Sequence, residues 1–285
     1  MRAGKPHSQG IFKGNGTQYD GEWLDGERHG HGFFQWSDGR SYEGDWKTGT
    51  YHGQGVSIDA SGGRYEGGWL DGKRHGQGKI VHPNSRDYEG GWRYGQYHGT
   101  GTAIWPSGAT YSGKWTNGKP SGGTFVWPNG DKYQGEWSDG FQEGKGVKTW
   151  ANGDRYEGRW VESRQSGKGI LVKADGEKYT GEWKGGRQNG KGVTINATGD
   201  KYEGNFKDGK SNGQGKKAWA NGEKYQGAWK NGKQHGKGSA VETNGDTYTG
   251  DWAGGKGTVR GSIPGPTRTT TTAIGQAAIW RVRAN

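Results

Sequence analysis

Aromatic residues and glycines alternate with polar residues in a short pattern that recurs along most of the chain. The pattern that starts at Tyr133 reads YQGEWSDGFQEGKG, with an aromatic, a glycine and a tryptophan at alternate positions and polar residues between them. A fixed period of this kind indicates an array of structural repeats. The pattern recurs every 23 residues, with one interval of 22, starting at Tyr19, Tyr42, Tyr65, Tyr88, Tyr111, Tyr133, Tyr156, Tyr179, Tyr202, Tyr225 and Tyr248.

Each repeat predicts two β-strands. In Tyr19–Trp23 the tyrosine, glycine and tryptophan share one face, because side chains alternate between faces along a strand, and the two acidic residues between them face solvent. Asp25–Gly26 then marks a tight turn, and a second strand is expected over about His29–Trp36. The turn Ser37–Gly39 leads back into the next repeat. Two turns in each repeat leave no room for a helix, so we expect an all-β chain with one antiparallel hairpin per repeat.

The glycines explain how so many large rings can pack together. A glycine in mid-strand weakens the strand unless another group must approach its backbone closely. Gly21, with Gly30 and Gly32 of the second strand, leaves flat slots in which Tyr and Trp rings can lie. One hairpin alone buries too little apolar surface to offset the entropy of ordering its backbone, so neighbouring repeats must stack. We therefore expect an elongated single-sheet solenoid of antiparallel β-hairpins.

The repeats divide the chain into three parts. Residues 1–18 have the features of a degenerate half-repeat that caps the array, with Gly16 at the position of a closing glycine. Residues 19–255 hold eleven repeats, and residues 256–285 form an extended, basic, Thr-rich C-terminal tail. One repeat is a residue short at Lys119–Gly123, where we expect a kink or a twist defect.

The composition predicts an ordered chain without a single large core. Only 26% of the residues are hydrophobic, against about 45–50% apolar in an average globular domain. The chain nevertheless holds 16 Trp and 14 Tyr, whereas disordered chains are poor in aromatic residues. The absence of Cys excludes disulfide bonds, cysteine-rich zinc sites and thiol catalysis.

The net charge of +11 comes largely from the two ends of the chain. Residues 1–18 hold three basic and no acidic residues, and residues 253–285 hold five basic and none acidic. Mixed charges in the array are typical of a solvated surface, so we expect no nucleic-acid partner. The N-terminal residues contain no apolar signal segment, and no stretch approaches the roughly 20 apolar residues of a membrane span. These features favour a cytoplasmic location.

A second column of tryptophans precedes the return turns. A position that is aromatic in some repeats and polar in others indicates a partly exposed column, because Asp59, His82, Lys173, Asn196 and Glu242 take the same place elsewhere. Exposed aromatic residues are typical anchors of protein interfaces. The candidate partner-binding residues are therefore the five column members and the aromatic and basic residues of the tail: Trp36, Trp105, Trp127, Trp150, Trp219, Trp280, Arg281 and Arg283.

The unit Tyr65–Gly78, with Tyr-Glu-Gly, a tryptophan and a later His-Gly-x-Gly, resembles the MORN repeat (membrane occupation and recognition nexus). The resemblance covers about residues 19–252 in eleven units. It implies an elongated antiparallel sheet of hairpins, as the residues themselves do. Similar repeats occur in radial-spoke and other ciliary proteins, in cytoskeletal scaffolds and in junctophilins. They also precede separate catalytic domains in some kinases and methyltransferases, whereas only a short tail follows the array here.

The residues show no pattern typical of an enzyme. His29, His52, His75, His98 and His235 share one register, and repeats of two strands place such positions about 10 Å apart, too far for a shared metal. The Gly-x-Gly patterns do not open helices, so they do not predict a phosphate-binding loop. Carboxylates recur in every unit, whereas a catalytic pair should be singular. We expect no enzyme activity, cofactor, metal or small-molecule substrate.

Two hypotheses of function remain. The first is a non-catalytic scaffold that binds other proteins of a larger assembly, with a ciliary axoneme or another cytoskeletal structure favoured by the resemblance. The second is a peripheral membrane protein that binds anionic phospholipids through its basic residues.

Overall fold

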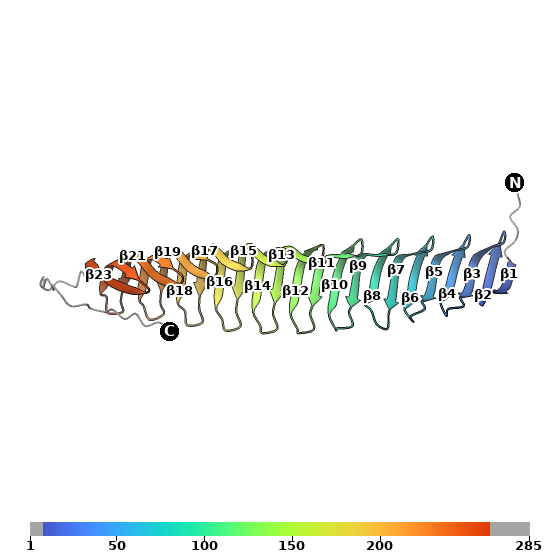
Figure 1. Ribbon diagram of the computed structural model, residues 1–285, viewed down its shortest axis with the longest axis horizontal. Coiled ribbons are helices and arrows are strands. Elements are labelled where there is room, and N and C mark those ends of the chain that lie inside the picture. The colour runs from blue at the N-terminus through green and yellow to red at the C-terminus, as the bar shows by residue number, and fades with distance from the viewer. Residues whose placement is uncertain (1–7, 263–285) are drawn as a thin grey trace. The chain divides into compact units, whose positions relative to one another are not determined.

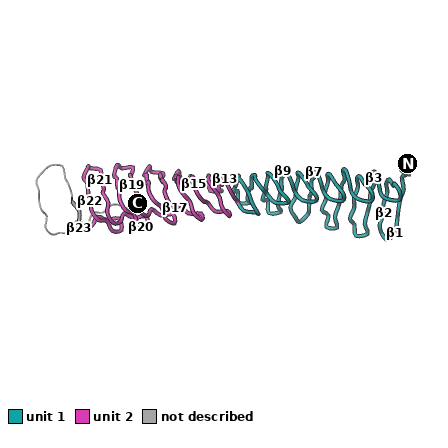
Figure 2. Tube along the Cα trace, turned by 90° about the horizontal axis from the view of Figure 1, so that it is seen from above, with its two compact units in different colours: residues 1–141 teal, residues 142–285 magenta. Residues whose placement is uncertain are grey.

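The computed structural model describes residues 8–262, with their side chains as far as Thr258. All secondary structure in this range is β-strand (Figure 1). The chain divides into two compact units, residues 1–141 and residues 142–285 (Figure 2). Each unit is built in the same way, from strands that pair with their neighbours in the sequence.

The first unit contains an antiparallel meander in which each strand pairs with the next. Its strands are β1 (Ser8–Gly14), β2 (Thr17–Leu24), β3 (Glu27–Gln35), β4 (Ser41–Lys47), β5 (Thr50–Ile58), β6 (Arg64–Leu70), β7 (Lys73–Val81), β8 (Asp87–Arg93), β9 (Gln96–Ile104), β10 (Thr110–Thr116), β11 (Lys119–Val126) and β12 (Lys132–Ser138).

The second unit continues the same arrangement. Its strands are β13 (Phe141–Thr149), β14 (Arg155–Val161), β15 (Arg164–Val172), β16 (Lys178–Lys184), β17 (Arg187–Ile195), β18 (Lys201–Lys207), β19 (Lys210–Ala218), β20 (Lys224–Lys230), β21 (Lys233–Val241), β22 (Thr247–Ala253) and β23 (Lys256–Ser262). The prediction of an all-β fold with one antiparallel hairpin per repeat is confirmed. Strand pairing extends to Ser262, which lies within residues 256–285, the segment expected to form the tail.

A two-residue turn closes each hairpin. Thr48 and Gly49, between β4 and β5, both have positive φ, at 45° and 73°. Two positive φ values define the type I′ turn, whose twist matches that of a β-hairpin. Successive tight turns are joined by a backbone hydrogen bond, as where the amide of Gly49 donates to the carbonyl of Arg28 at 3.0 Å. The tight-turn edge of each unit is therefore held in register from repeat to repeat.

A five-residue return turn leads from each hairpin to the next. In Trp36–Arg40 the Trp36 amide donates to the Arg40 carbonyl at 2.9 Å and the Gly39 amide donates to the Trp36 carbonyl at 3.1 Å. Gly39 has a φ of +88°, which glycine adopts without strain. In the one return turn with Ser85 in the glycine position, the His82 amide donates instead to Oδ1 of Asp87 at 2.9 Å.

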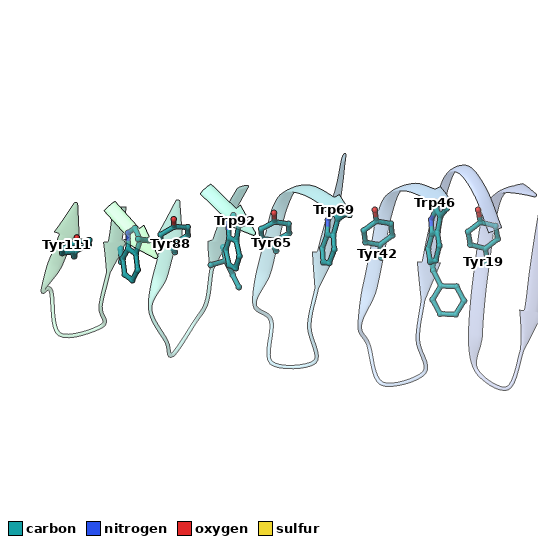
Figure 3. Close-up of a cluster of buried hydrophobic side chains, with 12 residues drawn as sticks. Tyr19, Tyr42, Trp46, Tyr65, Trp69, Tyr88, Trp92 and Tyr111 are labelled. Carbon is teal, nitrogen blue, oxygen red and sulfur yellow. The ribbon is translucent and has the colours of Figure 1, made fainter. Parts of the chain in front are cut away.

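The aromatic core of each unit follows from the repeat (Figure 3). The tyrosine and the strand tryptophan point to the same face, so Tyr42 packs edge-on against Trp46 of its own strand at 5.1 Å and Trp69 of the next repeat at 5.5 Å. The Trp46 indole donates to the carbonyl of Gly32, in the preceding repeat, at 3.0 Å. Each ring is thus buried by two hairpins, which explains why one repeat needs its neighbours.

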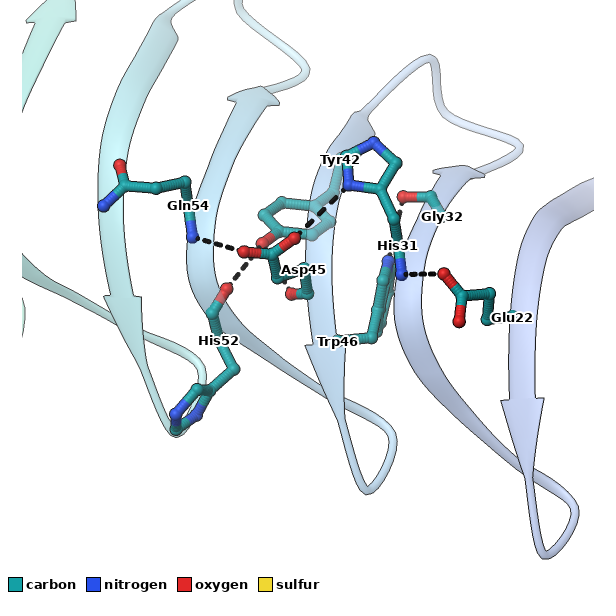
Figure 4. Close-up of polar contacts among 8 residues, drawn as sticks. All are labelled: Glu22, His31, Gly32, Tyr42, Asp45, Trp46, His52 and Gln54. Atoms are coloured by element: carbon teal, nitrogen blue, oxygen red, sulfur yellow. Dashed lines mark hydrogen bonds and ion pairs between the residues drawn. The ribbon is translucent and has the colours of Figure 1, made fainter. Parts of the chain in front are cut away.

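The second strand of the repeat hairpin contains a bulge, which affects the solvent face of the sheet. Gly44 pairs with Gly55 and Trp46 pairs with Tyr51, so Asp45 alone faces three residues of β5. The Asp45 carboxylate accepts a hydrogen bond from the Gln54 amide at 2.9 Å and contacts His31 at 3.3 Å (Figure 4). The Asp45 carboxylate therefore ties the bulge to its own strand and to the preceding repeat.

The short repeat at Lys119–Gly123 keeps its hairpin but loses part of the bulge. Lys114 pairs with Gly122 and Trp115 pairs with Pro120, so the shift in register is one residue smaller than in the other hairpins. In the next repeat the Trp137 indole nitrogen is buried without a hydrogen-bond partner. The missing residue thus leaves one unsatisfied donor inside the first unit.

We predict that the aromatic ladder makes the fold sensitive to alkali. Burial raises the pKa of Tyr65 and of Tyr225 to about 12, against the usual value of 10.0. A raised folded-state pKa contributes stability that is present in full below pH 10 and is lost as the pH rises through 12. Several equivalent tyrosines ionise together, so circular dichroism and phenolate absorbance should change in one transition. Ionisation of the buried tyrosines near pH 10 in a chain that keeps its structure would contradict this.

Candidate functional site

The second tryptophan column lies where the return turns begin, on the aromatic face. All five members that the structure describes are half-buried, whereas most strand tryptophans are buried, such as Trp46 at 3% and Trp160 at 2% exposure. In each member the backbone amide donates to the carbonyl four residues later, at 2.9 Å. The turn therefore fixes the backbone of the column, while part of each indole remains open to solvent. The five are Trp36, Trp105, Trp127, Trp150 and Trp219.

In the first unit these indoles pack against other aromatic rings. Trp36 packs edge-on against Phe34 at 4.3 Å. Trp105 and Trp127 lie on either side of Phe125, at 5.3 Å and 4.6 Å between ring centroids. The structure thus brings Trp105 and Trp127 together in one aromatic patch, whereas Trp36 lies in a separate one.

Cations lie near the column in both units. In the first unit the guanidinium of Arg40 lies 5.3 Å from the ring centroid of Trp36, and that of Arg86 lies 5.3 Å from that of Trp105. A cation near a tryptophan face is held by the ring quadrupole.

In the second unit the ammonium group of Lys148 lies 5.3 Å from the ring centroid of Trp150, and that of Lys217 lies 4.7 Å from that of Trp219. Lys217 also reaches Asp200 at 3.8 Å. Anchors in both units therefore combine an apolar surface with a positive charge.

The residues that face the strand tryptophans across each hairpin were not predicted from the sequence. Arg28 lies 4.5 Å from the ring centroid of Trp46, and Arg74 lies 4.9 Å from that of Tyr65. In the alternate repeats Tyr51 stacks on Tyr42 at 3.8 Å with an interplanar angle of 11°. Burial lowers the pKa of the Arg28 guanidinium, an effect that the Tyr51 phenol opposes. Their common register, at the second residue after the tight turn, is the signal that could have identified them.

The three candidate residues of the tail, Trp280, Arg281 and Arg283, lie outside the described residues. Between residues 8 and 262, no group of three or more His, Asp or Glu side chains is placed to hold a metal ion. The same range contains no helix long and apolar enough to span a membrane.

A family model described as "MORN repeat" matches the chain in ten consecutive segments. They cover residues 19–39, 42–64, 65–85, 88–110, 111–132, 133–155, 156–178, 179–201, 202–224 and 225–247. The eleventh unit expected from the sequence starts at Tyr248 and contributes β22 and β23.

Solved structures show only distant likeness. The TCP domain of Drosophila melanogaster SAS-4 (dCPAP), in complex with a proline-rich motif of Ana2, is 13% identical, with 60% of this chain and 81% of that chain covered and a TM-score of 0.31. The TCP10 domain of Danio rerio CPAP is 12% identical, with 85% and 93% covered and a TM-score of 0.22. Similarity this low supports no inference about this chain, and no match was found among curated proteins.

The ten matched segments span most of the chain, and the hairpins, tight turns and stacked rings of the structure correspond to the same units. The chain belongs to the MORN repeat family.

Proposed function

We propose that this protein is a non-catalytic scaffold that binds other proteins through the second tryptophan column, in the cytoplasm and within a cytoskeletal assembly such as a ciliary axoneme. Membership of the MORN repeat family indicates a repeat-based interaction scaffold. The observation that carries the proposal is the column itself, in which ordered turns hold half-exposed indoles. The cytoskeletal and ciliary setting rests on the family resemblance alone.

The physical basis of the proposal is the cost of ordering side chains. A tryptophan that is already fixed by its turn and its neighbours loses little conformational freedom when a partner covers it. Aromatic residues with this property dominate the energetics of protein interfaces. Trp105 and Trp127, which flank Phe125, form one such patch in the first unit.

We predict that alanine at Trp36, Trp105, Trp127, Trp150 and Trp219 lowers partner recovery at least tenfold. Recovery would be measured by cross-linking and affinity capture with quantitative mass spectrometry. Each anchor that contributes about 1 kcal/mol or more to binding lowers affinity about fivefold or more when removed.

A matched control exists in the same register. Alanine at Asp59, His82, Lys173, Asn196 and Glu242 changes five return turns without removing an indole, and this variant should retain its partners. Circular dichroism would establish that both variants are folded. An unchanged set of partners in the folded tryptophan variant would show that the column is not the binding surface.

A second candidate function is binding to anionic phospholipids. Residues 142–262 carry 22 basic and 14 acidic residues, whereas residues 8–141 carry 13 and 15, so the positive charge is concentrated in the second unit. Each basic residue near an anionic membrane contributes about 1 kcal/mol. Flotation with phosphatidylserine vesicles at physiological salt would support this function, and its absence for the full chain would exclude it.

A further inference from the structure

The tight-turn edge of the second unit carries cations in an arrangement that the first unit lacks. Three consecutive hairpins have a basic residue on both sides of the tight turn, and the members of each pair lie directly opposite one another. We name these three pairs the basic row. They are Lys184 with Arg187, Lys207 with Lys210, and Lys230 with Lys233.

Like charges directly opposite one another on a sheet are destabilising. The equivalent pairs of the first unit contain no such combination: Leu24 faces Glu27, Lys47 faces Thr50, Leu70 faces Lys73, Arg93 faces Gln96 and Thr116 faces Lys119. In the second unit Val161 faces Arg164 and Ala253 faces Lys256. The unfavourable pairing is thus confined to three adjacent repeats.

The fold does not compensate this charge. All six side chains are exposed, and within residues 8–262 none of the six forms an ion pair. Asp208, inside one of the tight turns, is the only acidic residue in the three turns. A negatively charged ligand would therefore relieve repulsion that the protein itself leaves in place.

The basic row is also ordered at a constant spacing. The Gly209 amide donates to the Gln188 carbonyl, and the Gly232 amide donates to the Ser211 carbonyl, both at 2.9 Å. Two strands separate successive pairs, which corresponds to about 9.6 Å. Between the first two turns lies an open groove of about 750 Å³, lined by Lys184, Arg187, Asn189, Lys207, Asp208 and Asn212.

We propose that the basic row binds an extended acidic protein segment that carries a carboxylate at every third residue. Three residues of a polyproline II chain span about 9.3 Å, which matches the repeat of the row. The Asn189 and Asn212 amides beside the groove can donate to the backbone carbonyls of such a segment. Glu182 is exposed on the same face, two residues before Lys184, and repels a flat anionic surface, whereas a single extended chain can pass beside it.

The test is fluorescence anisotropy of the full chain with a labelled peptide, EPSEPSEPSEPS, at 50 and 150 mM salt. A peptide of the same composition with its acids adjacent, PSPSEEEEPSPS, should bind at least fivefold more weakly. The triple variant R187Q/K210Q/K233Q removes one cation from each pair and should raise the Kd at least tenfold. The control K47Q/K73Q/R93Q removes three cations from tight turns of the first unit and should change the Kd less than twofold.

Folding of the variant is followed separately. R187Q/K210Q/K233Q relieves three like-charge pairs, so its thermal midpoint at low salt should equal or exceed that of the parent chain. Equal loss of peptide binding in both triple variants, or equal binding of both peptides, would overturn the proposal. The proposal would also be overturned by a third result: phosphatidylserine vesicles bind the parent chain but not R187Q/K210Q/K233Q, and the peptide binds neither of these two proteins.

This inference is independent of the proposed scaffold surface. The basic row lies at the tight-turn edge on the solvent face, whereas the tryptophan column lies at the return turns on the aromatic face. The five-alanine tryptophan variant should therefore bind the spaced peptide as the parent chain does. Loss of peptide binding in that variant would contradict the separation of the two surfaces.

Discussion

Gly78→Ala is expected to unfold the repeat in which it lies, with a loss of about 3–5 kcal/mol of stability. A Cβ at this position would overlap the hydroxyl of Tyr65 and lie 2.6 Å from its Cζ atom. Tyr65 is fully buried, and its hydroxyl donates to the carbonyl of Gly68 at 2.9 Å. The ring therefore cannot move away without exposing apolar surface and breaking a buried hydrogen bond.

The short repeat offers a matched control for this prediction. A Cβ at Gly122 would meet only the carbonyl of Gly135, at 3.8 Å, so Gly122→Ala should cost less than about 1 kcal/mol. Urea unfolding would give the two stabilities, and hydrogen exchange would show whether the loss is local to β6 and β7. Similar destabilisation by both substitutions would show that the close approach to tyrosine is not the reason for the strand glycines.

Trp160→Ala should destabilise the second unit by about 3–5 kcal/mol, the cost usual for removing a large buried ring. Trp160 is 2% exposed, packs against Tyr156 at 5.1 Å, and donates from its indole to the carbonyl of Gly146 at 3.2 Å. Trp160→Phe should cost only about 1–2 kcal/mol, because it keeps most of the ring contact and loses the hydrogen bond.

Phe206 supports the smaller estimate, because it takes the tryptophan position of its own repeat and packs against Tyr179 and Tyr202 at 5.1 Å each. Trp219→Ala, at a half-buried indole of the second column, is the control and should cost less than Trp160→Ala. The measurement is again urea unfolding. Equal costs for Trp160→Ala and Trp219→Ala would mean that the two columns contribute alike to stability.

The fold could be predicted because each part of the repeat has a local cause. Alternation from Tyr19 to Trp23 predicts the buried face, and Asp25–Gly26 predicts the tight turn, which requires two positive φ values. The bulge opposite Asp45 could not be predicted, because strand alternation does not reveal extra residues that are accommodated by a change in register. The missing residue at Lys119–Gly123 is visible in the sequence, but only the structure shows that the Trp137 indole of the next repeat lacks a hydrogen-bond partner.

The candidate surfaces were predictable to different degrees. Polar residues replace tryptophan in some repeats of the second tryptophan column, which indicates partial exposure. In the structure its five tryptophans are half-buried. The basic row could be identified only from the strand register in the structure. Lys184 and Arg187 form a like-charge pair because the tight turn places them opposite one another. The net charge of these repeats does not reveal the cluster of cations, because the acidic residues of the same repeats lie elsewhere along the strands.

The pairing of every strand with its neighbours in the sequence has a mechanical consequence. Tension on a terminus loads the outermost hairpin first, because no strand within residues 8–262 is held by a partner distant in the sequence. Each hairpin should peel away with its own return turn and leave the remaining rings of that unit stacked. An extended chain under load would then lengthen in small, equal steps and shorten again by re-forming one hairpin at a time, as a reversible spring does.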